Sequence, residues 1–287
     1  MAITPASLAL YRRRKLRNAV GMTLSTASMV LGLAALLWIL WTLFYNGLSA
    51  LSVEFFTAST PAPGTEGGGL ANAIVGSLMM VGLATVVSTP VGILAGIYLA
   101  EYGRRSRFGS ITRFITDVML SAPSIVIGLF VYAIAVATVK QFSGWAGSLA
   151  LSLIAIPVVV RTTENMLNLV PGSLREAAFA LGAPRWKVSL AVTLRAVKGG
   201  VLTGVLLAVA RIIGETAPLL FTALSNQFYS ADMSQPMANL PVVIYQFAMS
   251  PYENWQHLAW GGAALIALIV LLINIVARTL FRERLQA

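Results

Sequence analysis

The 287 residues are 57% hydrophobic and only 10% charged, with a mean hydropathy of +0.81, which excludes an ordinary soluble domain and indicates a membrane protein. The absence of cysteine excludes disulfides and cysteine metal sites, and the single histidine, His257, argues against a metal cluster or a catalytic triad. The formal charge of +10 comes from basic residues between apolar segments, so membrane topology explains it better than nucleic-acid binding does.

Residues 1–18 form a basic arm in front of the first apolar segment. This arrangement mimics a signal peptide, but the apolar stretch from Leu24 to Phe44 is long enough to span a membrane and lacks an obvious small-residue cleavage site. We therefore expect an uncleaved first transmembrane helix at residues 19–47, followed by an external loop at residues 48–73.

Five more apolar segments are expected within residues 74–281, which form the core of the protein. They lie near residues 74–98 and 114–139, in a stretch that ends at 157–161, and near 201–224 and 258–281. The connections include a loop at 164–198, a second external loop at 225–257 with a short helix near 240–249, and a tail at 282–287. The sequence therefore predicts an all-α integral membrane protein with six transmembrane helices.

The basic residues predict the orientation of these helices. Lysine and arginine gather within residues 1–18, 104–113, 161–198 and 278–284, whereas Lys140 alone falls in a segment expected on the opposite side. Because cytoplasmic segments carry an excess of basic residues, both termini and the loop at 164–198 are predicted to be cytoplasmic.

That loop contains a helix-turn-helix pattern. Ser173 and Glu176 have the spacing of a capping box, Gly182 suits a left-handed helix end, and Pro184 suits the first position of a second helix. One helical face of the first helix would carry Leu174, Ala177, Ala178 and Leu181.

Glu176, Ala177, Ala178 and Gly182 resemble the EAA loop of ABC-importer permeases. The resemblance implies that these residues seat in a groove on a partner ATPase. A capping glutamate occurs at many helix starts, so an ordinary capping role for Glu176 stays open. The chain has Arg195 where the family pattern has a proline, so the end of the loop is expected to differ.

Two pairs of opposite charges lie in or beside the apolar segments. Arg211 is midway along the fifth segment, where an isolated charge costs about 3 kcal/mol, so it must face protein or water. Glu215 lies one turn later, and either the two neutralise each other between helices or they line a path for an anion. Arg161 and Glu164, spaced i, i+3, are either an interfacial anchor or substrate contacts.

A third pair of charges lies near the start of the third segment. Arg113 and Asp117 are spaced i, i+4, which predicts a local ion pair.

A wider resemblance covers nearly the whole chain. The stretches that carry it are residues 65–72 (TEGGGLAN), 121–126 (SAPSIV), 161–167 (RTTENML) and 214–220 (GETAPLL). They resemble the PstA-type permease subunits of bacterial phosphate ABC importers. The resemblance implies a MetI-like permease fold and a role in phosphate passage for Arg161, Glu164 and Arg211, while Glu215 follows by its spacing.

The resemblance also implies a set of partners. These are a second permease subunit of the PstC type, a dimeric ATPase of the PstB type, an external phosphate-binding protein of the PstS type, inorganic phosphate and membrane lipid, with no nucleic acid. No G-x-x-x-x-G-K-[ST] phosphate loop occurs in the chain, so ATP and Mg are expected on the ATPase and no cofactor or metal on this chain.

The sequence thus indicates a permease without catalytic residues in a bacterial cytoplasmic (inner) membrane, which moves inorganic phosphate by alternating access. A permease for another oxyanion, such as sulfate, molybdate or a phosphonate, remains an alternative. An ion-coupled carrier or channel that works without an ATPase, and a structural subunit without a pathway, are two further alternatives.

Overall fold

The computed structural model describes the backbone of residues 5–280 and the side chains of residues 10–279. The predicted tail at 282–287 lies outside the described residues, as does the start of the predicted basic arm. The chain divides into two units, residues 1–46 and residues 47–287.

The described part of the first unit is one long helix. Helix α1 runs from Pro5 to Leu48, and its stretch from Leu10 to Leu48 is long and apolar enough to cross a membrane. Large apolar side chains such as Leu31 and Trp38 are exposed along it. A helix with this much exposed apolar surface is suited to lipid or to another apolar helix.

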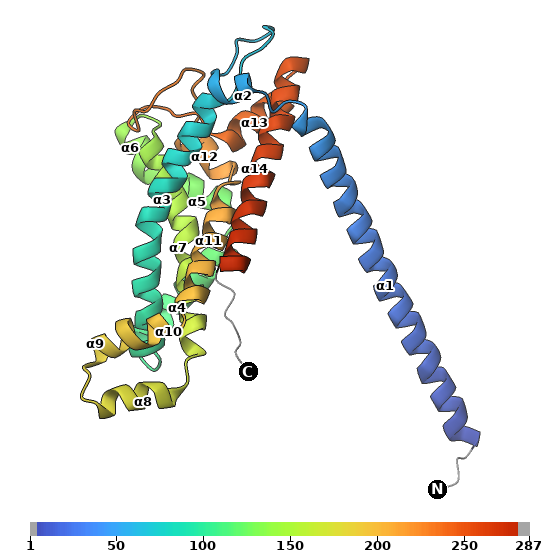
Figure 1. The fold of residues 1–287 in the computed structure, drawn as a ribbon, viewed down its shortest axis with the longest axis vertical. Helices are drawn as coiled ribbons and strands as arrows, with labels where there is room; N and C mark the ends of the chain where they lie inside the picture. The colour runs from blue at the N-terminus through green and yellow to red at the C-terminus, as the bar shows by residue number, and fades with distance from the viewer. Residues whose placement is uncertain (1–4, 281–287) are drawn as a thin grey trace. The chain divides into compact units, whose positions relative to one another are not determined.

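The second unit is a bundle of helices, and no β-strand occurs within residues 5–280. Its elements are α2 (Val53–Thr57), α3 (Ala71–Ile97), η1 (Tyr98–Tyr102), α4 (Arg107–Ser121), α5 (Ser124–Val131), η2 (Tyr132–Val136), α6 (Ala137–Val139), α7 (Gly144–Asn168), α8 (Gly172–Ala180), α9 (Arg185–Lys187), η3 (Val188–Thr193), α10 (Leu194–Ala196), α11 (Lys198–Ile212), α12 (Ala217–Thr222), α13 (Leu240–Ala248) and α14 (Glu253–Leu280). The η elements are π-helical turns. In Figure 1, α8 to α10 lie at one end of the bundle and α2 and α13 at the other.

Helix α7 is the central element of the bundle. In its most apolar window 67% of the residues are buried, against 28% for α3 with η1 and 22% for α14. Helices α3 and α11 pack on either side of it (Figure 1). The main core cluster includes Met80 from α3, Leu151 and Val159 from α7, and Ile212 from α11. Residues on α7 are therefore held more firmly than those on the outer helices.

Glycines let the neighbouring helices approach α7 closely. A Cβ atom added to Gly96 of α3 would lie 2.6 Å from Cβ of Thr163, and one added to Gly204 of α11 would lie 2.2 Å from Cγ2 of Thr162. Small residues at such contacts are typical of helices packed within membranes.

Two pairs of helices are bent rather than straight. The α4 helix and the α5–α6 segment meet at 106°, and the α9–α10 segment and α11 meet at 75°. At the first bend Ala122 is extended, because the following Pro123 disfavours helical geometry at the residue before it. Four helices are long and apolar enough to cross a membrane, and counting each bent pair as one span gives six among the described residues. The prediction of an all-α membrane protein is confirmed.

The predicted boundaries differ from the structure in several places, since α1 already begins at Pro5 and α14 at Glu253, before the first predicted residues of these helices. The segment expected at 114–139 is broken at Ala122, and the one expected at 201–224 is interrupted between Ile212 and Ala217. Helix α7 continues to Asn168, so the first residues of the predicted loop at 164–198 are helical. The short helix expected near 240–249 is present as α13, and the Asn239 side chain caps it by accepting the N–H of Val242.

The substitution Gly204→Ala is expected to destabilise the bundle by about 1–3 kcal/mol, because the new methyl group overlaps Thr162. The matched control is Gly82→Ala, a helical position at which the added Cβ meets no described atom within 4 Å apart from its chain neighbours and its own helix backbone. Thermal unfolding of the purified protein measures the difference. Equal melting temperatures for the two variants would contradict the proposed close packing.

Candidate functional site

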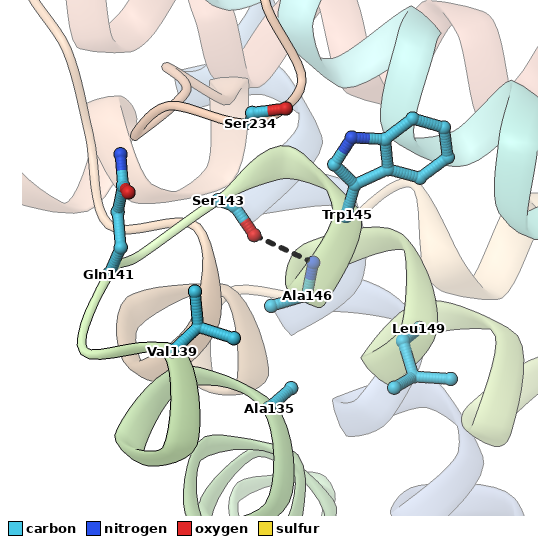
Figure 2. A pocket seen from close by; sticks show the side chains of 8 residues that line it. All are labelled: Ala135, Val139, Gln141, Ser143, Trp145, Ala146, Leu149 and Ser234. Atoms are coloured by element: carbon cyan, nitrogen blue, oxygen red, sulfur yellow. Dashed lines mark hydrogen bonds between the residues drawn. The ribbon is translucent and has the colours of Figure 1, made fainter.

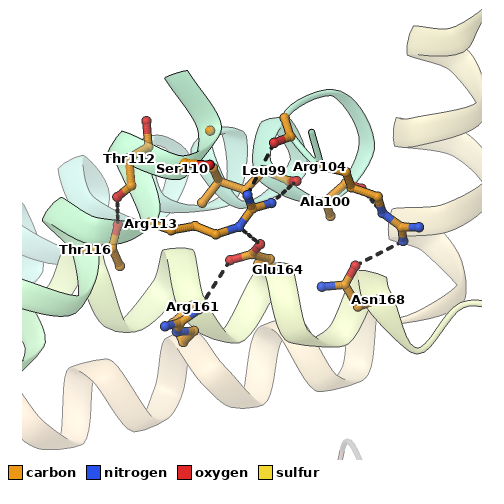
Figure 3. Close-up of polar contacts among 12 residues, drawn as sticks. Leu99, Ala100, Arg104, Ser110, Thr112, Arg113, Thr116, Arg161, Glu164 and Asn168 are labelled. Carbon is orange, nitrogen blue, oxygen red and sulfur yellow. Dashed lines mark hydrogen bonds and ion pairs between the residues drawn. The ribbon is translucent and has the colours of Figure 1, made fainter. Parts of the chain in front are cut away.

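The side chains of Arg113, Asp117, Arg161 and Glu164 form a charge cluster where α4 packs against α7. Arg113 donates from Nε to Oε1 of Glu164 at 2.6 Å. Its other nitrogens donate to the backbone carbonyl of Leu99 at 2.7 Å (Figure 3) and to that of Gly103 at 3.3 Å. Arg113 therefore joins α4 to α7 and to the end of the α3–η1 helix.

The members of the charge cluster differ in exposure. The Glu164 side chain is 6% exposed, whereas those of Arg161 and Asp117 are 36% and 51% exposed. Arg161 donates from Nη2 to Oδ1 of Asp117, and its Nη1 lies 3.7 Å from Oε2 of Glu164. The predicted i, i+3 contact between Arg161 and Glu164 is thus a Coulombic contact rather than a hydrogen bond.

The expected local pair between Arg113 and Asp117 is wrong. Each of the two residues instead pairs with a residue of α7, Arg113 with Glu164 and Asp117 with Arg161. The reason is that α4 packs against α7, which buries the Glu164 carboxylate. A buried carboxylate needs a cation in direct contact, and Arg113 provides it.

Arg211 and Glu215 lie at the break between α11 and α12. Nε of Arg211 is 3.8 Å from Oε1 of Glu215, and the two side chains are 42% and 16% exposed. The pair is therefore loose and leaves most of the guanidinium free to meet another anion. Among residues 10–279, no hydrogen bond or ion pair joins it to the charge cluster.

The predicted coupling residues lie on α8 and its C-terminal turn. None of the described residues of α8 is buried, and Glu176 and Ala177 are exposed. Gly182 has φ +79°, its N–H donates to the carbonyl of Phe179, and the N–H of Ala183 donates to that of Ala178. These two bonds form a Schellman motif, so the left-handed helix end predicted at Gly182 is confirmed.

The start of α8 differs from the prediction. The helix begins at Gly172 with Pro171 as its N-cap, and in this described segment no side-chain hydrogen bond caps it. The capping box of Ser173 and Glu176 is wrong because Ser173 already lies inside the first turn, where its hydroxyl is too far along the helix to act as the cap. Pro184 is likewise the N-cap of α9 rather than its first residue.

Arg175 attaches α8 to the bundle. It donates to both carboxylate oxygens of Glu101 at 2.8 to 3.2 Å, and to the carbonyls of Leu167, at 2.8 Å, and Val170, at 2.6 Å. Leu167 lies in the last turn of α7 and Val170 just beyond it, so these bonds tie Arg175 to the end of that helix. The sequence reasoning missed this contact, for which the only local signal is one glutamate beside the basic run at 104–107.

A cavity of about 350 Å³ lies at the other end of α7. Figure 2 shows its lining residues, which are Ala135, Val139, Gln141, Ser143, Trp145, Ala146, Leu149 and Ser234. None of these described residues is charged, and the hydroxyl of Ser143 already accepts the N–H of Ala146 at 3.2 Å. The cavity therefore offers no cation to a small anion, in contrast to Arg161 and Arg211.

The helical fold and the family match define the class of protein. Residues 92–282 match the family described as binding-protein-dependent transport system inner membrane component. At 59% identity, the chain is similar to the phosphate transport system permease protein PstA of Yersinia pestis, covering 96% of this chain and 92% of that protein. The PstA of Pasteurella multocida is 61% identical over 96% and 98% of the two chains. The chain belongs to the PstA family of permeases.

Solved structures support the fold of this family. An inward-facing MetNI methionine ABC transporter matches with a TM-score of 0.57 at 19% identity, over 74% of this chain and 92% of that one. A bacterial ABC transporter involved in alginate import matches with a TM-score of 0.61 at 13% identity, over 97% and 100%. The predicted MetI-like permease fold is confirmed. The chain is a permease subunit without catalytic activity of its own, in a multi-pass inner-membrane family.

Removing either partner of the Arg175–Glu101 pair is expected to cost about 3 kcal/mol, because the remaining charge is left largely buried. The double variant Arg175→Ala/Glu101→Ala is expected to be no less stable than Arg175→Ala alone. Thermal unfolding of the four proteins gives the coupling energy. Additive effects would show that the two side chains do not depend on each other.

Proposed function

We propose that this chain is the transmembrane permease subunit of an ATP-driven importer that carries inorganic phosphate. The observation that carries the proposal is the 59% identity over nearly the whole chain to a permease of a phosphate transport system. The partly exposed guanidinium groups of Arg161 and Arg211 support it, since arginine matches phosphate oxygens with two parallel donors.

Arg161, Glu164, Arg211 and Glu215 are proposed to line the phosphate path. Each arginine has a carboxylate close by but keeps a third or more of its side chain exposed. The carboxylates make the empty path tolerable inside a membrane, where an unpaired guanidinium is costly. A passing phosphate then competes with these carboxylates for the arginines. The competition lets phosphate bind and leave again.

Phosphate transport by alternating access requires parts that move as rigid bodies. The bends at Ala122 and Val197 and the break at residues 213–216 divide the bundle into such parts. We propose that α8, with Glu176, Ala177, Ala178 and Gly182, receives the movement from a partner ATPase that binds ATP and Mg. Arg175 passes it on to α7 and η1, because its hydrogen bonds join all three elements.

The other proposed partners follow from the family. They are a second permease subunit of the PstC type, a PstB-type ATPase dimer and a PstS-type external phosphate-binding protein. The end of the bundle that carries α8 would face the cytoplasm together with both termini, as the basic residues predict. The outer segments around Thr65 to Asn72 and Asn226 to Pro251 would then receive the binding protein on the external side.

Arg211→Gln is expected to reduce phosphate uptake to background while the complex still assembles, because glutamine offers no positive charge to the anion. Arg105→Gln is the control, since it removes a charge from an exposed residue outside the path. Uptake of radiolabelled phosphate by a deletion strain that carries each variant is the measurement. Wild-type uptake by the Arg211 variant would exclude it from the path.

The same assay separates the alternative functions. Competition by sulfate as strong as that by unlabelled phosphate would favour another oxyanion as the substrate. Uptake that survives inactivation of the ATPase would favour an ion-coupled carrier.

Gly182→Val is expected to lower uptake and ATPase binding, because a β-branched residue at positive φ costs about 1–2 kcal/mol and distorts the end of α8. Gly182→Asn is the matched control, since asparagine adopts this conformation more readily. Co-purification of the ATPase with each variant measures the coupling. If both variants retain the ATPase equally, the turn is not needed for seating it.

A further inference from the structure

We propose that the Asp117 carboxylate competes with phosphate for Arg161. Asp117 pairs with Arg161 while the path is empty, and phosphate displaces it on arrival. The inference rests on the proposed function and extends it to a residue outside the predicted path. It follows from the difference in exposure between the two carboxylates of the charge cluster, since Glu164 is buried and Asp117 is exposed.

Glu164 is the fixed carboxylate of the charge cluster. Its side chain is 6% exposed and accepts the 2.6 Å hydrogen bond from Nε of Arg113. Arg113 is itself held by the backbone carbonyl of Leu99 (Figure 3) and by that of Gly103. An arriving anion cannot easily displace Glu164, because removing one partner of a buried ion pair is strongly unfavourable.

Asp117 is the exchangeable carboxylate. Its side chain is 51% exposed, and its contact among the described side chains is the hydrogen bond from Nη2 of Arg161. Ion pairs with this exposure contribute little to stability, because water and salt screen them. An anion that reaches Arg161 therefore replaces Asp117 at small cost.

The position of Arg161 makes such an exchange specific. Its Nη1 is 3.7 Å from Glu164, too long for a hydrogen bond, so the guanidinium retains donors for an oxyanion. A carboxylate and a phosphate each present oxygens that match the guanidinium fork. When Asp117 returns to Arg161 it expels the phosphate, so the residue lowers the affinity of the site and speeds release.

The test is Asp117→Asn in the purified importer complex. The variant keeps the shape of the side chain but removes the competing charge. It is expected to bind radiolabelled inorganic phosphate about fivefold more tightly in the absence of nucleotide, the factor expected for removing a partly exposed competing pair. The maximal rate of ATP-driven uptake is expected to fall by a similar factor. Asp117→Glu, which restores a carboxylate, is expected to return both quantities toward the wild-type values.

Three results would overturn the inference. They are unchanged phosphate binding by Asp117→Asn, weaker binding together with a lower melting temperature, and failure of Asp117→Glu to restore release. The second result would mean that Asp117 merely anchors α4 to α7. Failure of the proposed function is distinguishable, because the wild-type complex itself would then neither bind nor take up phosphate.

Discussion

Arg113 donates from Nε to the buried carboxylate of Glu164 and from its other nitrogens to the carbonyls of Leu99 and Gly103. This three-way contact joins α4, α7 and the end of the α3–η1 helix. A buried carboxylate must have a cation beside it, so these elements are held in one arrangement. Arg161, three residues before Glu164, is left with a partly exposed guanidinium beside the fixed carboxylate. The proposed phosphate path, with its displaceable Asp117, depends on that fixed neighbour.

The bundle combines tight packing around α7 with breaks in the outer helices. Gly96 and Gly204 allow α3 and α11 to approach α7, where Thr163 and Thr162 leave no room for another methyl group. In contrast, the α4–α5 connection bends at Ala122. Helix α11 ends at Ile212, one residue after Arg211, and Glu215 lies in the break that follows. Tight contacts transmit movement and breaks permit it, and a permease requires both.

Helix α8 is attached to the bundle through Arg175, while most of its other residues are exposed. Arg175 holds it through Glu101 and the Leu167 carbonyl of α7. The Schellman motif at Gly182 sets the direction in which the chain leaves it. Glu176 and Ala177 remain exposed on the described chain. An exposed helix on a rigid attachment is suited to receive force from a partner and to pass it into the bundle.

Local rules were enough to predict the membrane class, the apolar helices, the α13 helix and the left-handed turn at Gly182, because backbone hydrogen bonding and steric limits act within a few residues. The same rules failed for Arg113, whose i, i+4 spacing pointed to Asp117. Its partner is Glu164, 51 residues away. Only the tertiary structure decided this pairing, and likewise that of Arg175 with Glu101. The burial of a carboxylate between packed helices determines which cation it needs, and no local spacing encodes which helices will pack.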